Sequence, residues 1–183
     1  MKPFLVLEDV SRPSRLLFSA WGVEWWATRW AWVGPLFWIA LALPVAWAQD
    51  GGLLRGVAYG ILLYLSNTIH TLGHFGAGTL AGARMDAVVL TSTRNVDVYR
   101  GAKRDVPTRV RVLRSLGGPA ANALVGAAAL GLGAAAEGAP EVRGWLAVLG
   151  LFNLAIAAWT LLPVPTLDGW ILWRALLYRR RGG

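Results

Sequence analysis

The sequence predicts an all-α polytopic membrane protein, with about four transmembrane helices and a small β-hairpin at the cytoplasmic interface. Of the 183 residues, 56% are hydrophobic and only 15% are charged, whereas soluble domains average about a quarter charged residues. The charged residues are also segregated, because none occurs in the stretches 30–49, 56–83, 115–136 and 144–167. Each stretch is long enough for one helical span, which needs about 20 mostly apolar residues.

The positive charge alternates along the chain. The formal net charge is +8, and the basic residues are concentrated in the N-terminal arm, in segment 84–114 and in the C-terminal tail. The loops at 50–55 and 137–143 carry few basic residues. Cytoplasmic loops of membrane proteins carry an excess of Lys and Arg, so both termini and segment 84–114 are expected to face the cytoplasm. Topology and anionic lipids then account for the charge, and no nucleic-acid partner is expected.

Residues 1–29 are expected to form a cytoplasmic arm, and residues 30–183 the membrane domain. The arm leads into a cluster of tryptophans, a residue that prefers the membrane interface: Trp21, Trp25, Trp26, Trp30 and Trp32. The first span, about 30–49, contains two prolines, which suits a peripheral helix better than a catalytic one. It ends in Ala46-Trp47-Ala48, which resembles a signal-peptidase site, but the long Trp-rich arm with its acidic residues argues against cleavage.

Three further spans are expected at 56–80, 115–136 and 144–162. A β-hairpin is expected at 86–100, and a short amphipathic tail at 167–183. The hairpin is predicted from its β-forming residues, with a turn at Arg94-Asn95. The third span is rich in Ala and Gly and is expected to pack centrally. In the second span, Gly78 lies four residues before Gly82, a spacing of small residues that lets helices approach closely.

Three polar residues in these apolar surroundings point to a metal site. His70 and His74 are the only histidines of the chain, and positions four apart share one face of a helix. Asp168 is the only acid after Glu141, and it follows a helix break on the side of the membrane where the topology places His74. Two imidazoles and one carboxylate, with a fourth position open, is the arrangement of a catalytic zinc.

Other interpretations of these residues stay open at this point. The histidine pair could be hydrogen-bonded to helix carbonyls or to Asn67 and Asn122, and Asp168 could cap the short tail helix. A histidine pair in a span could also serve a membrane metal-handling or transport protein. The sequence offers no second cluster of ligands along a path through the membrane, so transport is the least favoured of these interpretations.

Three motifs occur in a fixed order along the chain: His70-x-x-x-His74 within a span, Gly117-Gly118-Pro119-Ala120-Ala121-Asn122 opening the next, and Pro163-x-Pro165-x-Leu167-Asp168-Gly169 after the last. In order, spacing and topology they resemble the site-2 protease family of intramembrane zinc metalloproteases. The resemblance covers roughly residues 56–175, so the arm and the first span lie outside it.

The resemblance implies that zinc is the cofactor and that His70, His74 and Asp168 bind it. It also implies that four residues lie at or near the substrate: Gly118, Pro119, Asn122 and Thr160. The hairpin at 86–100 corresponds to one that is thought to present the substrate as an added strand. The expected partners are membrane lipids and a single-span membrane protein as client.

Two positions depart from the family pattern. The family motif His-Glu-x-x-His carries a glutamate that is the general base for the attacking water, and this chain has Thr71 there. Thr160 stands where the family usually has an asparagine. A threonine hydroxyl cannot take that proton at neutral pH, and losing a general acid–base catalyst typically costs about 10²–10⁴ in rate. The sequence therefore predicts a zinc metallopeptidase scaffold with weak or lost proteolysis.

An active intramembrane protease with a substitute base is the alternative to this prediction. Glu137 and Glu141 are expected on the far side of the membrane, and the acids of the arm are distant in sequence. Asp86 and Asp97 are assigned to the cytoplasmic loop. Asp86 is the only candidate near the histidines in sequence.

Overall fold

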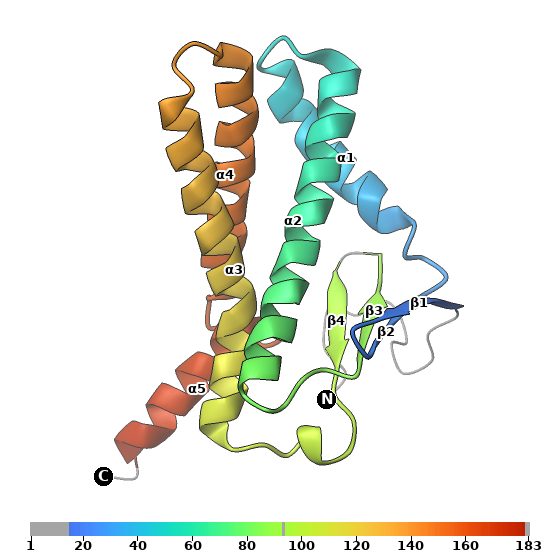
Figure 1. Cartoon of the computed structure of the whole chain (residues 1–183), viewed down its shortest axis with the longest axis vertical. Helices are drawn as coiled ribbons and strands as arrows, with labels where there is room; N and C mark the ends of the chain where they lie inside the picture. Colours follow the sequence, from blue (N-terminus) through green and yellow to red (C-terminus); the bar gives the residue numbers. More distant parts are fainter. Residues whose placement is uncertain (1–14, 93, 182–183) are drawn as a thin grey trace.

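The computed structural model describes residues 15–92 and 94–181. Helices α1 to α4 form an elongated bundle, in which α1 packs against α2, α2 against α3, and α3 against α4 (Figure 1). The helices are α1 (Val33–Trp47), α2 (Gly52–Leu80), α3 (Thr108–Ala135), α4 (Pro140–Thr160) and α5 (Asp168–Arg181). The strands are β1 (Arg15–Ala20), β2 (Val23–Ala27), β3 (Ala87–Leu90) and β4 (Asn95–Val98), followed by a short 3-10 helix, η1 (Gly101–Lys103).

Among the described helices, α3 and α4 are long and apolar enough to cross a membrane. Helix α1 has 15 residues, or about 22 Å at 1.5 Å per residue, which is shorter than a hydrocarbon core of about 30 Å. Helix α2 has 29 residues, but Ser66, Asn67 and the two histidines interrupt its apolar composition. Length and composition therefore support two of the four expected spans directly.

Helix α3 begins at Thr108, ahead of the expected start at residue 115. The apolar stretch does start at Ser115, but the preceding arginines do not end a helix, since arginine has a high helix propensity. The extension includes Arg114 in the helix, and the carbonyl oxygen of this residue contacts His74. The boundary of an apolar stretch is thus a poor guide to the end of this helix.

The hairpin expected in segment 86–100 is confirmed as β3 and β4, which pair antiparallel. Asn95, which was expected in the turn, is the first residue of β4. Strands β1 and β2 were not predicted from the sequence. They pair antiparallel, and β2 lies parallel to β3, so the arm completes a four-stranded sheet in the order β1-β2-β3-β4.

The sheet has a small apolar core of its own. Val23 and Trp25 of β2 are buried together with Met85 and Val88. Trp25 is therefore a core residue and not the interfacial residue that was expected. Within the cluster of five tryptophans, Trp21, Trp30 and Trp32 have the largest exposed fractions.

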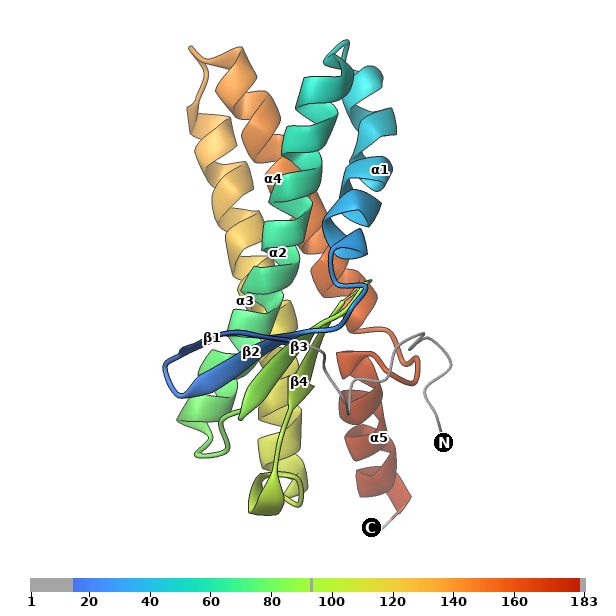
Figure 2. The ribbon, with the colours of Figure 1, turned by 90° about the vertical axis from the view of Figure 1, so that its right-hand side faces the viewer.

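The two ends of the bundle differ in what they carry. The turns between α1 and α2 and between α3 and α4 lie at one end, and the sheet, η1 and α5 lie at the other (Figure 1). Figure 2 shows the same division from the side. Segment 84–114 and α5 therefore share one end, in agreement with the alternation of charge along the sequence. The C-terminal part of α2 ends there too, which brings His74 near the start of α5.

Helices α2 and α3 cross closely at a pair of glycines. A Cβ added to Gly73 would lie 2.3 Å from the carbonyl oxygen of Gly117, and one added to Gly117 would lie 2.3 Å from that of Gly73. Small residues allow such an approach. It was expected instead at Gly78 and Gly82, but Gly82 has nothing within 4 Å of its added Cβ and has a φ of +68°. Gly82 therefore serves the turn after α2, a conformation that glycine adopts without strain.

Candidate metal centre

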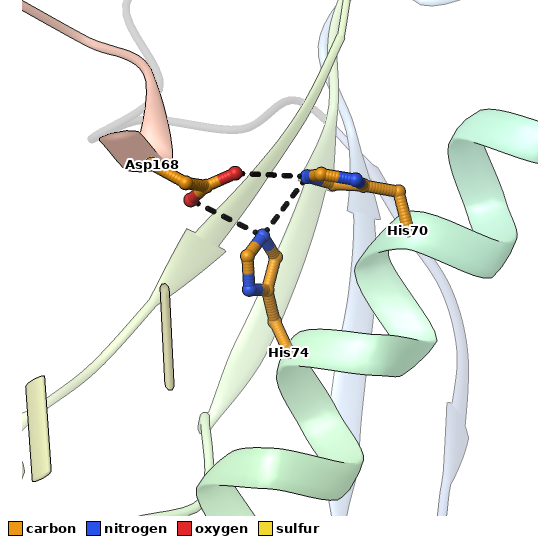
Figure 3. A group of neighbouring side chains, drawn as sticks. All are labelled: His70, His74 and Asp168. Carbon is orange, nitrogen blue, oxygen red and sulfur yellow. Dashed lines mark hydrogen bonds and ion pairs between the residues drawn. The ribbon is translucent and has the colours of Figure 1, made fainter. Parts of the chain in front are cut away.

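His70, His74 and Asp168 meet at the end of the bundle that holds the sheet (Figure 3). Nε2 of His70 lies 3.0 Å from Oδ2 of Asp168, and Nε2 of His74 lies 3.3 Å from Oδ1. The two Nε2 atoms are 3.1 Å apart. Around a tetrahedral ion with bonds of 2.0–2.1 Å, ligand atoms lie about 3.3 Å apart. The three residues are therefore spaced as ligands of one metal ion.

The second nitrogen of each imidazole faces an acceptor. Nδ1 of His70 is 2.8 Å from Oδ1 of Asn122, and Nδ1 of His74 is 2.7 Å from the carbonyl oxygen of Arg114. Each Nδ1–H donates to its acceptor, which leaves the Nε2 lone pair directed at the shared point. Histidines that bind metals usually have such an outer partner, which sets the tautomer and the orientation of the ring.

Gly118 leaves room for an ion between the histidines. A Cβ added at this position would lie 2.6 Å from Nε2 of His70 and 2.6 Å from Nε2 of His74. Any larger residue would therefore occupy the space toward which both nitrogens point. The open space, the nitrogen and oxygen donors and the oriented rings all fit a zinc ion.

Asn122 also joins α3 to two other helices. Its Nδ2 donates to the carbonyl oxygen of Ser66 in α2 over 3.2 Å and to Oδ1 of Asn153 in α4 over 2.7 Å. Asn153 in turn donates to Oγ of Ser66 over 2.9 Å. Asn122, Asn153 and Ser66 are fully buried. Asn153 and Ser66 were not among the predicted site residues, although an asparagine in an apolar helix is a signal that could have identified Asn153.

A tight turn between α4 and α5 brings Asp168 to the histidines. A Cβ added to Gly169 would lie 2.0 Å from the carbonyl oxygen of Leu161, so only glycine allows α5 to begin against the end of α4. Thr166 has a φ of +89°, a strained conformation for a β-branched residue. Its carbonyl oxygen accepts a hydrogen bond from Nη1 of Arg94 over 3.3 Å. The turn is thus held from the β3–β4 hairpin.

Thr71 lies on α2 between the two histidines and is buried. Its hydroxyl donates to the carbonyl oxygen of Asn67 over 3.2 Å and accepts a hydrogen bond from Nδ2 of Asn95 over 3.0 Å. Asn95, which was not a predicted site residue, therefore links β4 to α2. Neither Thr71 nor Asn95 provides a carboxylate for proton transfer.

The residues expected at the substrate divide into two groups. Gly118, Pro119 and Asn122 are buried on α3, and Gly118 and Asn122 lie against the histidines. Thr160 is not brought into this group. Its hydroxyl donates to the carbonyl oxygen of Ile156 over 2.9 Å, within its own helix. Contact of these four residues with a substrate remains a prediction.

No family model matches the chain, and no curated protein matches it. Its structure is similar to that of the site-2 protease from Methanocaldococcus jannaschii, with a TM-score of 0.65 at 19% sequence identity. The match covers 90% of this chain and 72% of that chain. It is therefore longer than the segment 56–175 that carries the three motifs. Together with the two apolar helices, it indicates a membrane protein, and the chain has the fold of a site-2 protease.

Proposed function

We propose that this protein is a membrane-embedded zinc metallopeptidase of the site-2 protease type, with slow turnover. The observation that carries the proposal is the meeting of His70, His74 and Asp168 at one point that Gly118 leaves open. A catalytic zinc has three protein ligands and an open fourth position. The fold of the chain supports the same assignment.

In this proposal the two histidines and Asp168 hold zinc, which supplies Lewis acidity and lowers the pKa of water. Asn122 and the Arg114 carbonyl keep the imidazoles oriented through their Nδ1 atoms. The Thr71 hydroxyl cannot accept a proton from water at neutral pH, and losing a general acid–base catalyst costs about 10²–10⁴ in rate. For this reason the proposed turnover is slower than it would be with a glutamate at position 71.

The proposed substrate is an extended segment of a single-span membrane protein. Strand β4 is the last strand in the sheet order and packs against α2, the helix of the histidines. An extended peptide can add to an exposed sheet edge through backbone hydrogen bonds. A segment added along β4 would therefore lie close to the metal centre.

The test combines zinc content with cleavage of a fluorescent single-span peptide by the purified protein in detergent. The wild type is expected to hold about one zinc and to cleave slowly, and His70→Ala is expected to lose both. Leu65→Ala, a change at an exposed position of the same helix, is the matched control and is expected to keep both. Thr71→Glu places the family carboxylate on α2: a gain of about 10²–10⁴ would show that the wild type works without a base, and no gain in an active wild type would show that another residue serves as one.

Two results would contradict this function. One is the absence of stoichiometric zinc from the folded wild type. The other is cleavage that persists in His70→Ala. Metal transport has less support, since His70, His74 and Asp168 are the one group of three or more potential ligands within residues 15–92 and 94–181.

A further inference from the structure

Strand β4 turns one face toward helix α2, and this face carries two polar residues. Side chains alternate between the two faces of a strand, and β4 pairs with β3 in regular register, so Asn95 and Asp97 share a face. Nδ2 of Asn95 donates to Oγ1 of Thr71 over 3.0 Å. Asp97 lies two residues after Asn95 on the same face of β4, so it also faces α2.

Asp97 lies beside the metal centre without belonging to it. The charged groups that act on its carboxylate include His74, Asp168 and His70. It is not among the three residues whose ligand atoms lie within 4.8 Å of one another. A general base needs this kind of position, within reach of the attacking water directly or through one further water.

The carboxylate of Asp97 is available for proton transfer. Within the described part of the chain it forms no ion pair and accepts no side-chain hydrogen bond. Burial raises the pKa of Asp97 to about 6, although the nearby histidines oppose the shift. A carboxylate can accept a proton from water and, once protonated, donate it again.

Asp86, the candidate base from the sequence, is engaged elsewhere. Its carboxylate accepts hydrogen bonds from Nζ of Lys103 and from the backbone N–H of Arg100. Burial raises the pKa of Asp86, but these partners outweigh it and hold the pKa below its ordinary value. Glu24 is likewise bound, by Trp26 and Arg100. Neither acid is placed to act on water at the metal centre.

We propose that Asp97 is the general base, and then the general acid, of this peptidase, in place of the family glutamate that Thr71 replaces. The proposal rests on the zinc peptidase function proposed above. In this proposal the proton is transferred by a residue of strand β4, whereas in the family it is transferred by a glutamate on the helix that carries the histidines.

The carboxylate of Asp97 takes one proton from the attacking water while the water oxygen bonds to the scissile carbonyl carbon. The π electrons of the carbonyl move to its oxygen. They then re-form the C=O bond as the C–N bond breaks with its electron pair on nitrogen. Asp97 gives its proton to this nitrogen. One water is consumed, one carboxylic acid and one amine are formed, and Asp97 is again a carboxylate.

The kinetic test compares Asp97→Asn with Asp105→Asn, the same change at an exposed acid of the loop before α3. Asp97→Asn is expected to lower kcat/KM by about 10²-fold or more, and Asp105→Asn is expected to behave as the wild type. In a second comparison, Thr71→Glu/Asp97→Asn is expected to cleave as fast as Thr71→Glu alone. If Asp97 had only a structural role, the activity lost in Asp97→Asn would not be restored by the glutamate that Thr71→Glu adds to α2.

The independent readout is proton release on binding of acetohydroxamate, measured by calorimetry at pH 7.5 in two buffers of different ionisation enthalpy. A hydroxamic acid binds zinc as its anion, and a nearby carboxylate keeps the proton. The wild type is expected to release close to no protons per bound probe, and Asp97→Asn close to one. Zinc content is expected to be the same in both proteins, because Asp97 is not a ligand.

The outcomes separate the two proposals. A protein without zinc refutes the proposed function. Zinc-loaded protein in which Asp97→Asn changes neither kcat/KM nor proton release overturns the role of Asp97. Loss of zinc in Asp97→Asn also overturns it, because Asp97 would then be a ligand. If the wild type binds zinc and the probe but cleaves nothing, the peptidase function fails, and the role of Asp97 as its base fails with it.

Discussion

At the scale of single residues, the candidate metal centre depends on the absence of a side chain at position 118 as well as on the three potential ligands. Gly118 lies where a Cβ would come within 2.6 Å of both Nε2 atoms. A Cβ at this position would also come within 2.7 Å of Cε1 of His70, so the two imidazole rings would have to shift. They would lose the common point that an ion needs.

Gly118→Ala is expected to abolish stoichiometric zinc binding, because the new methyl group takes the place of the ion. Gly131→Ala is the matched control, since it lies on the same helix with nothing within 4 Å of an added Cβ. Zinc per protein chain after dialysis, measured by mass spectrometry, is the readout. Circular dichroism shows whether the helices persist. Wild-type zinc content in Gly118→Ala would show that the ion does not lie between these nitrogens.

At the scale of elements, three helices meet through one buried polar network. Asn122 of α3 accepts from His70 and donates to Asn153 of α4, and Asn153 donates to Ser66 of α2. Hydrogen bonds between membrane helices contribute about 0.6 kcal/mol each on average. A buried group left without its partner costs about 1–3 kcal/mol. The network therefore stabilises the packing and also orients one imidazole.

Asn153→Leu is expected to destabilise the protein by about 1–3 kcal/mol, because Asn122 and Ser66 lose a buried partner. It is also expected to weaken zinc binding by up to about 10-fold, because Asn122, the outer partner of His70, loses a bond that helps to hold it in place. Thr160→Ala on the same helix is the control, since the Thr160 hydroxyl bonds only to carbonyls of α4. Thermal unfolding and zinc competition give the two readouts. Equal effects of both changes would argue against a special role for the network.

At the scale of the whole molecule, the candidate metal centre and the segments rich in Lys and Arg lie at the same end of the helix bundle. The sheet, η1 and α5 are grouped there, and the turn between α3 and α4 lies at the far end (Figure 1). The charge alternation predicts that the end with the site faces the cytoplasm. A substrate segment would then reach β4 from the cytoplasmic side of the membrane.

Cysteine labelling can test this orientation, because the natural chain contains no cysteine. Asp105→Cys in the loop before α3 and Gly138→Cys in the turn between α3 and α4 are both at exposed positions. In intact cells, a membrane-impermeant maleimide is expected to label Gly138→Cys only, and in inverted vesicles Asp105→Cys only. Leu124→Cys, exposed in the middle of α3, is expected to stay unlabelled in both. The reverse pattern would invert the predicted topology.

The three candidate metal ligands could be named from the sequence because their relation is local or depends on topology alone. His70 and His74 need only one helix, and Asp168 needs only to follow a helix break at the same end of the bundle. Asp97 could not be predicted in this way, because its distance from the histidines depends on the register of β4 and on the docking of the hairpin. Nearness to the histidines in sequence favoured Asp86 as the substitute base. In the structure, however, the Asp86 carboxylate accepts hydrogen bonds from Lys103 and Arg100.

The sequence by itself determined the apolar helices, the histidine pair and the absence of the family glutamate, since composition and spacing along one helix suffice for each. Only the tertiary structure decided that β1 and β2 complete the sheet, that Gly118 leaves the space for an ion, and that Asp97 faces the histidine helix. These features arise from contacts between segments far apart in the chain. Their geometry depends on packing and strand register, which no local pattern of residues specifies.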